Sequence, residues 1–243
     1  MHYTKRIEDK PIKKYIFKTL TGIMVLCIGS TSLNAAPSYG TGMLDKRQAV
    51  IGTETYTLFD RDLEDSQGCI RSLQHFFLLS YGVFDWLTID LKGGAGYIKQ
   101  NPANAAELDY PTSFAGGYGF RIKLYENENH SLRAVFGFHH ISVHPRSIRV
   151  NGTKRRAILD DWQTELLFSK DMFGTTPYLG TKWSRVDYIH WENGTRKRRM
   201  SDLTRSIGLI AGIDIPLTQE VSLNLEGHFM DEKAFSAAFL YSF

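Results

Sequence analysis

The sequence has little cysteine and little proline: two Cys and seven Pro in 243 residues. Cys27 lies in an N-terminal segment that we predict to be removed, which leaves Cys69 alone. A single cysteine excludes a disulfide framework and a cysteine-based metal site within one chain. After residue 36 the sequence also lacks any uninterrupted apolar run of about 18 residues, which argues against a membrane-spanning helix.

The sequence also lacks a strong excess of one charge. The formal net charge is +3, but residues 1–36 carry six basic and two acidic residues, so the remaining chain is close to neutral. This balance excludes a global nucleic-acid partner, and any basic function has to be local. No phosphate-binding glycine-rich loop and no metal-ligand cluster appears. We therefore expect no cofactor, no metal and no nucleic acid.

Residues 1–36 have the pattern of a secretory signal peptide. Three lysines at positions 13, 14 and 18 form a positive end, and a short apolar stretch follows over 20–33. The stretch closes on the small residues Asn34-Ala35-Ala36, which is typical of a cleavage site. We predict Sec-type export, cleavage after Ala35 or Ala36, and a single domain over 37–243.

Alternation of apolar and polar residues dominates the exported chain. In 221–230, for example, Val221, Leu223 and Leu225 alternate with Ser222, Asn224 and Glu226. A period of two places every second side chain on one face of a β-sheet. Ten such runs are found, at 48–59, 71–83, 87–97, 114–124, 132–139, 162–168, 179–184, 205–217, 221–230 and 234–243.

The connections between these runs alternate in length. The short ones lie at 84–86, 126–130, 169–176 and 216–220, and the longer ones at 60–70, 99–113, 144–157 and 191–202, with a short last one at 231–233. Short turns at one end and longer loops at the other are typical of outer-membrane barrels. The sequence therefore predicts an all-β fold, a closed antiparallel transmembrane β-barrel of about ten strands, with eight or twelve as alternatives.

The polar faces of the runs favour a membrane barrel over a secreted soluble sandwich. They mix charges with many glycines, which suits an enclosed interior better than a soluble surface. We expect the apolar faces to contact lipid, with aromatic girdles at strand ends. The girdle residues expected are Tyr97, Trp162, Tyr178, Trp183, Trp191, Tyr241 and Phe243.

The C-terminal residues Phe239-Leu240-Tyr241-Ser242-Phe243 carry a more specific resemblance. They resemble the last strand of Gram-negative outer-membrane β-barrels, with alternating hydrophobic residues and a terminal Phe. The turn at Tyr81–Leu87 is similar to their short periplasmic hairpins. The resemblance covers roughly 48–243 and identifies no subfamily. It implies the outer membrane as location, lipopolysaccharide as lipid environment, and recognition of the strand ending in Phe243 by the barrel assembly machinery.

Charged residues on the inward faces form the first candidate site. Acids and bases are equal in number, and opposed charges in a low dielectric are expected to pair. The predicted lumen charge network consists of Asp90, Lys92, Arg121, Lys123, Arg133, Asp161, Glu165, Lys182, Asp214 and Glu226. We interpret the lumen as plugged by these pairs, with a narrow porin-like channel as the alternative.

Two predicted outer loops are strongly basic, and each contains an Asn-Gly turn followed by a cationic run. Arginine binds phosphate and carboxylate groups well. The anion-binding candidates are Arg146, Arg149, Lys154, Arg155, Arg156, Arg196, Lys197, Arg198 and Arg199. We expect a structural or surface-binding, adhesin-like barrel without catalysis. The simpler alternative is surface electrostatics with no specific partner.

A weak catalytic constellation is also present. His140 and Ser142 are two residues apart and share the lipid-facing side of one strand, and Asp160 is positioned to join them from the next. A serine, a base and an acid are what acyl hydrolysis requires. The pair is similar to that of outer-membrane lipid A deacylases, but those carry Asn where this chain has Val143, and Glu where it has Asp160. A lipid A-modifying hydrolase is therefore a second alternative.

Overall fold

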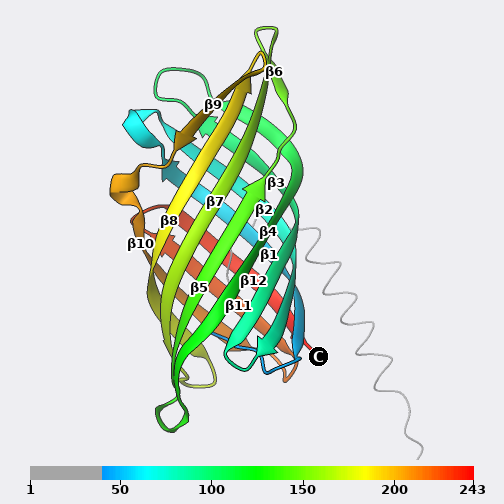
Figure 1. The fold of residues 1–243 in the computed structure, drawn as a ribbon, viewed down its shortest axis with the longest axis vertical. Helices are drawn as coiled ribbons and strands as arrows, with labels where there is room; N and C mark the ends of the chain where they lie inside the picture. Colours follow the sequence, from blue (N-terminus) through cyan, green and yellow to red (C-terminus); the bar gives the residue numbers. More distant parts are fainter. Residues whose placement is uncertain (1–39) are drawn as a thin grey trace, which may run out of the picture. The chain divides into compact units, whose positions relative to one another are not determined.

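The structure is a computed structural model that describes residues 40–243, so the predicted signal peptide lies outside the described residues. This part of the chain is almost entirely β-strand (Figure 1). The strands are β1 (Ala49–Asp62), β2 (Cys69–Phe84), β3 (Leu87–Asn101), β4 (Leu108–Asn127), β5 (Leu132–Val143), β6 (Ile148–Val150), β7 (Thr153–Lys170), β8 (Thr176–Glu192), β9 (Thr195–Met200), β10 (Ile207–Pro216), β11 (Val221–Phe229) and β12 (Lys233–Ser242).

Ten of these strands form a closed ring. Each pairs antiparallel with its neighbours, β1 closes the ring on β12, and β7 pairs with both β5 and β8. The short strands β6 and β9 pair only with β7 and β8 and extend them as hairpins. The predicted closed ten-stranded barrel is confirmed. Within residues 40–243 the helical segments are three-residue 3-10 turns, too short to cross a bilayer.

The sequence predicted the four longer connections to be longer than they are, because parts of them belong to strands in the structure. Residues 99–101, 108–113 and 153–157 belong to strands, and β8 and β9 continue through most of 191–202. In these segments the strand pairing continues beyond the region of apolar–polar alternation and provides hydrogen-bond partners for the backbone. The alternation alone does not reveal this additional pairing. We refer to the end with short turns, such as 85–86, as the periplasmic end, and to the other as the outer end.

The two Asn-Gly pairs form the tips of the outer hairpins. Asn151 and Gly152 join β6 to β7, and Asn193 and Gly194 join β8 to β9; all four have φ between 47° and 84°. Positive φ at both central positions defines the tight turn that matches the twist of paired strands. These residues therefore fix the register that places the basic side chains.

The alternation resolves into an apolar outside and a polar inside. Phe239 is 49% exposed, whereas Glu226 and Arg121 are 2% and 3% exposed. Ile213 and Leu223 have the outward parity of Phe239. One expected girdle residue is wrong: Tyr178 points inward, is 4% exposed and donates a hydrogen bond to Glu226 (2.8 Å). An inward Tyr is stable here because its hydroxyl has a partner.

The interior is filled in layers. Toward the outer end lies an apolar cluster that includes Tyr56, Leu58, Ile98, Leu159 and Tyr188, all at most 2% exposed. The charged groups lie mainly nearer the middle and the periplasmic end. The sequence interpretation of a lumen plugged by paired charges did not include this apolar layer. Most of its residues come from β1, β2 and the outer strand ends, whose parity the sequence did not fix.

Candidate functional site

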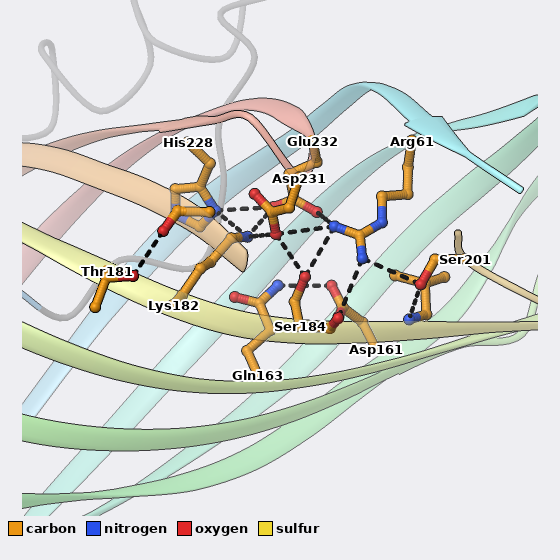
Figure 2. A network of polar contacts seen from close by, with 12 residues as sticks. Arg61, Asp161, Gln163, Thr181, Lys182, Ser184, Ser201, His228, Asp231 and Glu232 are labelled. Atoms are coloured by element: carbon orange, nitrogen blue, oxygen red, sulfur yellow. Dashed lines mark hydrogen bonds and ion pairs between the residues drawn. The ribbon is translucent and has the colours of Figure 1, made fainter. Parts of the chain in front are cut away.

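The densest group of interior charges lies where the outer ends of β11 and β12 meet the middle of β8 (Figure 2). Lys182 lies 3.2 Å from Asp231 and also contacts Glu232, while Arg61 binds Asp231 at 2.8 Å. His228 bridges from Glu232 (2.8 Å) toward Glu226. All are at most 4% exposed. The short β11–β12 turn thus inserts two carboxylates into the lumen.

The other predicted lumen residues lie in smaller groups, either between neighbouring strands or across one intervening strand. Arg121 binds Asp90 (2.9 Å). Lys92 binds Glu54 (2.7 Å), and Glu165 binds His139 (2.8 Å).

Hydrogen bonds rather than ion pairs hold the remaining interior acids. Asp161 accepts from Gln163 (2.7 Å), and Asp214 accepts from Asn224 (2.5 Å). Lys123 and Arg133 both bind Glu126 near the periplasmic end, where their side chains are about a quarter exposed. The network is therefore distributed rather than a single cluster across the lumen.

The lumen charge network predicted from the sequence omits several residues that bind its members or one another in the structure. They are Glu54, Arg61, His139, His228, Asp231 and Glu232. The sequence left the parity of β1 open, so Glu54 and Arg61 were not assigned to the interior. It identified 231–233 only as a short connection, with no direction for its side chains. A usable signal was present: His139 and His228 stand on the polar faces of their runs, and Asp231 and Glu232 directly follow the run 221–230.

The first described residues contact the barrel interior at the periplasmic end. Thr41 is fully buried, Arg121 donates to the Gly42 carbonyl oxygen (2.5 Å), and Arg133 donates to that of Thr41 (3.3 Å). Gly40 has φ +56°, and a Cβ there would lie 2.4 Å from Asp214. A cavity of about 260 Å³ remains beside this segment, lined in part by Arg121, Arg133 and Asp214.

The basic hairpins form a four-stranded sheet, β6-β7-β8-β9, at the outer end (Figure 1). Register sorts its side chains onto two faces. Arg155 and Glu192 are paired, and they share the inward face with Ala157 and Tyr188, which belong to the interior cluster. Lys197 and Arg199 are on this inward face as well, since they pair with His190 and Tyr188.

The inward face carries its own neutralising acid. Glu192 lies 3.2 Å from Arg155 and 3.3 Å from Lys197. The hydrogen bond from Lys197, with the nearby Arg155, lowers the pKa of Glu192, so its carboxylate stays charged beside these cations. The two bases closest to Glu192 are therefore paired and less available to an external anion.

The outward face has a surplus of positive charge. Arg156 and Arg196 flank Trp191, with guanidinium carbons 4.3 and 5.9 Å from the ring centroid. Arg149 and Lys154 are paired strand partners on the same face. Within residues 40–243 these four cations form no ion pair, whereas Arg198 binds Asp187. Arg146 lies apart, between β5 and β6, and is exposed.

Below the cations, toward the membrane, polar side chains interrupt the outward apolar face. We call this group the outer notch; it consists of His140, Ser142, His144, Asp160, Arg185 and Asp187. Ser142 Oγ donates to Asp160 and lies 2.8 Å from His144 Nε2.

His140 occupies the inner edge of the notch. Its Nε2 is 4.0 Å from Asp160, and its ring centroid is 3.9 Å from that of Trp162. The structure therefore brings Ser142 and Asp160 together, adds His144, and leaves His140 against an aromatic ring.

No cluster of three His, Cys, Asp or Glu side chains within 40–243 is arranged to hold a metal ion. The notch is a polar group instead, with a hydroxyl, two imidazoles, two carboxylates and a guanidinium. It can bind polar groups of a lipid, and it contains the functional groups of an acyl-transfer site. The outward cations add a place for negative charge.

No protein-family model and no curated protein matches this sequence. Solved structures do. An outer membrane channel from Pseudomonas putida F1 is 9% identical, with 85% of this chain and 99% of that chain covered and a TM-score of 0.45. The translocator domain of the autotransporter NalP from Neisseria meningitidis is 11% identical, with coverages of 95% and 96% and a TM-score of 0.48.

The attachment invasion locus protein Ail of Yersinia pestis is also similar, at 9% identity, coverages of 82% and 100%, and a TM-score of 0.40. The chain is an outer-membrane-type β-barrel. The decisive observation is its own closed ring with an apolar exterior, which points to the bacterial outer membrane. At these identities the likenesses concern the fold and assign no activity.

Proposed function

We propose that this barrel binds a phosphorylated lipid of the outer leaflet through the outward face of its β6–β9 hairpin sheet. One observation carries the proposal: four cations, Arg149, Lys154, Arg156 and Arg196, share that face without an ion-pair partner among the described residues. The face continues directly from the lipid-contacting side of β7 and β8. A lipid headgroup beside the barrel is therefore within reach of it.

The chemistry of the face fits phosphate. Arginine presents a planar fork of donors that suits phosphate oxygens, and Trp191 is flanked by Arg156 and Arg196. An amphipathic ring at this level also suits the boundary between hydrocarbon and headgroups. Lipid A, the phosphorylated anchor of lipopolysaccharide, combines acyl chains with phosphate and is the ligand we infer.

The test compares two double variants in purified, refolded protein. Arg156→Ala with Arg196→Ala removes outward cations, and Arg155→Ala with Lys197→Ala removes the same charge from the inward face. We expect the outward pair to weaken binding of bisphosphorylated lipid A about tenfold, and the inward pair less than threefold. Equal losses, or equal affinity for dephosphorylated lipid A, would contradict the proposal.

A second candidate function rests on the contacts of Ser142. Its hydroxyl lies between His144 and Asp160, on the lipid-facing side. In ester hydrolysis the Ser142 oxygen would attack an acyl carbonyl carbon, and His144 Nε2 would take the hydroxyl proton and return it to the departing alcohol. Water would then release the fatty acid and restore the serine. Asp160 contacts the serine rather than the imidazole, which differs from the usual triad.

Mass spectrometry of lipid A tests this candidate. Overexpression of the full chain is expected to remove one fatty acyl group, and Ser142→Ala to abolish the change while lipid A binding is kept. Thr164→Ala, an outward substitution on β7, is the matched control. An unchanged lipid A spectrum with the unaltered chain would remove the hydrolase and leave the binding proposal intact.

Recognition of the C-terminal strand by the assembly machinery stays a prediction. β12 pairs with β11 and closes the ring on β1, and the Phe243 side chain is 71% exposed. We infer that Phe243 is available before closure and expect Phe243→Ala to lower the amount of folded barrel in the outer membrane. Unchanged amounts would contradict this role.

A further inference from the structure

We propose that the outer notch thins the hydrocarbon layer of the membrane locally. Headgroups of outer-leaflet lipids beside β5, β7 and β8 then lie closer to the centre of the bilayer than they do around the rest of the barrel. The partner is the lipid surface itself. This deeper position of the headgroups follows from the polarity of the notch and does not require phosphate binding. The preference for a phosphorylated headgroup at this place rests on the function proposed above.

The length of the outward apolar face differs around the ring. On β4 the outward positions from Leu124 to Phe114 are apolar or glycine, about 33 Å along the strand at 3.3 Å per residue. On β7 the uncharged outward positions run only from Phe168 to Trp162, about 20 Å, before Asp160. At a tilt of about 40° these runs are roughly 25 and 15 Å tall.

The outward apolar runs of the two other notch strands, β5 and β8, are similarly short. On β5 the outward apolar side chains end at Phe138, before His140 and Ser142. On β8 they end at Trp183, before Arg185 and Asp187. A barrel of this class has an apolar band about 25 Å tall, which β4 reaches and the notch strands do not.

The notch ends abruptly between β5 and β4, as the pairing register of these two strands shows. Gly116 on β4 is the strand partner of Ser142, and Tyr118 is the partner of His140. Phe114 lies beside His144, with ring centroids 6.2 Å apart. Apolar and polar side chains therefore stand side by side on neighbouring strands, where the tilt of about 40° offsets strand partners by only about 3 Å in height.

The notch polar groups are bonded mainly to one another. Ser142 joins Asp160 and His144, and Asp187 lies 3.2 Å from Arg185 and also binds Arg198. These contacts lower the cost of a polar surface at the hydrocarbon edge but leave charge beside lipid. Charged groups on the lipid face are costly in mid-bilayer and nearly free at the interface. A bilayer adapts to a short apolar face by thinning, at a modest cost per Å.

Spin labels on one row test the proposal. Single cysteines replace Ser142 and its strand partner Gly116 in full-length protein that also carries Cys27→Ser and Cys69→Ser. Each labelled barrel is reconstituted in phosphatidylcholine vesicles, with and without lipid A. Power saturation then gives the accessibility of each label to a water-soluble nickel complex relative to oxygen.

We expect at least about fivefold greater relative nickel accessibility at position 142 than at 116, in both kinds of vesicle. Adding Asp160→Leu and Asp187→Leu should bring the value at 142 down to that at 116. Heat-dependent mobility in electrophoresis verifies that each variant is a folded barrel.

Equal values at 142 and 116 in the starting background would overturn the proposal, whether both labels are buried or both are wet. A difference that survives the double Leu substitution would also overturn it. Failure of the function proposed above gives a different result: the difference persists in both vesicles, while lipid A affinity is unaffected by the Arg156 and Arg196 substitutions.

Discussion

The basic residues of the lumen and those of the outer hairpins differ in partners rather than in number. Arg61 and Lys182 are each 1% exposed and share Asp231 and Glu232. Arg156 and Arg196, by contrast, are exposed and lie near Trp191 with no acid at ion-pair distance among the described residues. Charge in the interior is therefore satisfied by the fold, and charge on the outward hairpin face is left for an external anion.

The difference has a thermodynamic reason. A cation removed from water without a partner is strongly unfavourable, so interior bases are stable only with nearby acids. A cation at a hydrated surface needs no partner and gains little from one. Substitutions in the lumen should therefore lower the free energy of unfolding, whereas substitutions on the outward hairpin face should lower the affinity for an anion and leave the free energy of unfolding unchanged.

The largest effect is expected from Lys182→Met. This change leaves Asp231 and Glu232 buried with one cation fewer, and breaking a buried pair in this way costs about 3–5 kcal/mol. The free energy of unfolding in urea, measured with the barrel in lipid vesicles, checks the value. Lys154→Met, at the hairpin tip, should stay within about 0.5 kcal/mol. A similar loss for both variants would remove the distinction between the two regions.

A smaller effect is expected between Glu54 and Lys92, whose charged atoms are 2.7 Å apart. Glu54→Gln and Lys92→Met should each destabilise the barrel, and the double variant should lose less than the sum. The double-mutant cycle should give a coupling of about 1–3 kcal/mol. No measurable coupling would mean that the lumen charges are stable without their partners, contrary to the comparison made here.

The ring itself was predictable because period-two patterning is a property of each strand by itself. Runs such as 221–230 show which face is apolar, and Ile210, an exception to its own run, lies inside with Leu167 and Tyr178 in a small apolar cluster. The partners of the lumen charges were harder to predict. Lys92 lies on β3 and Glu54 on β1, so their contact crosses an intervening strand and depends on register and curvature.

The sequence predicted which residues make up the candidate site but not how they are arranged. The sequence shows the basic residues of the hairpins, but their division between two faces depends on the Asn-Gly turns and on the pairing of β7 with β8. Ser142 and Asp160 become neighbours through register alone. His144 was not selected because it follows the end of β5, where alternation no longer indicates direction.

The smallest effect is expected from a substitution that keeps the charge. Arg156→Lys retains a cation near Trp191 but loses the planar fork and the stacking that a guanidinium allows, a change of about 0.5–1 kcal/mol. Affinity for bisphosphorylated lipid A should fall roughly two- to fivefold, with the free energy of unfolding unchanged. Lys154→Arg is the reciprocal control and should not weaken binding. If Arg156→Lys binds as well as the unaltered chain, the outward face acts only through its net charge, and salt alone should then abolish the preference for phosphorylated lipid.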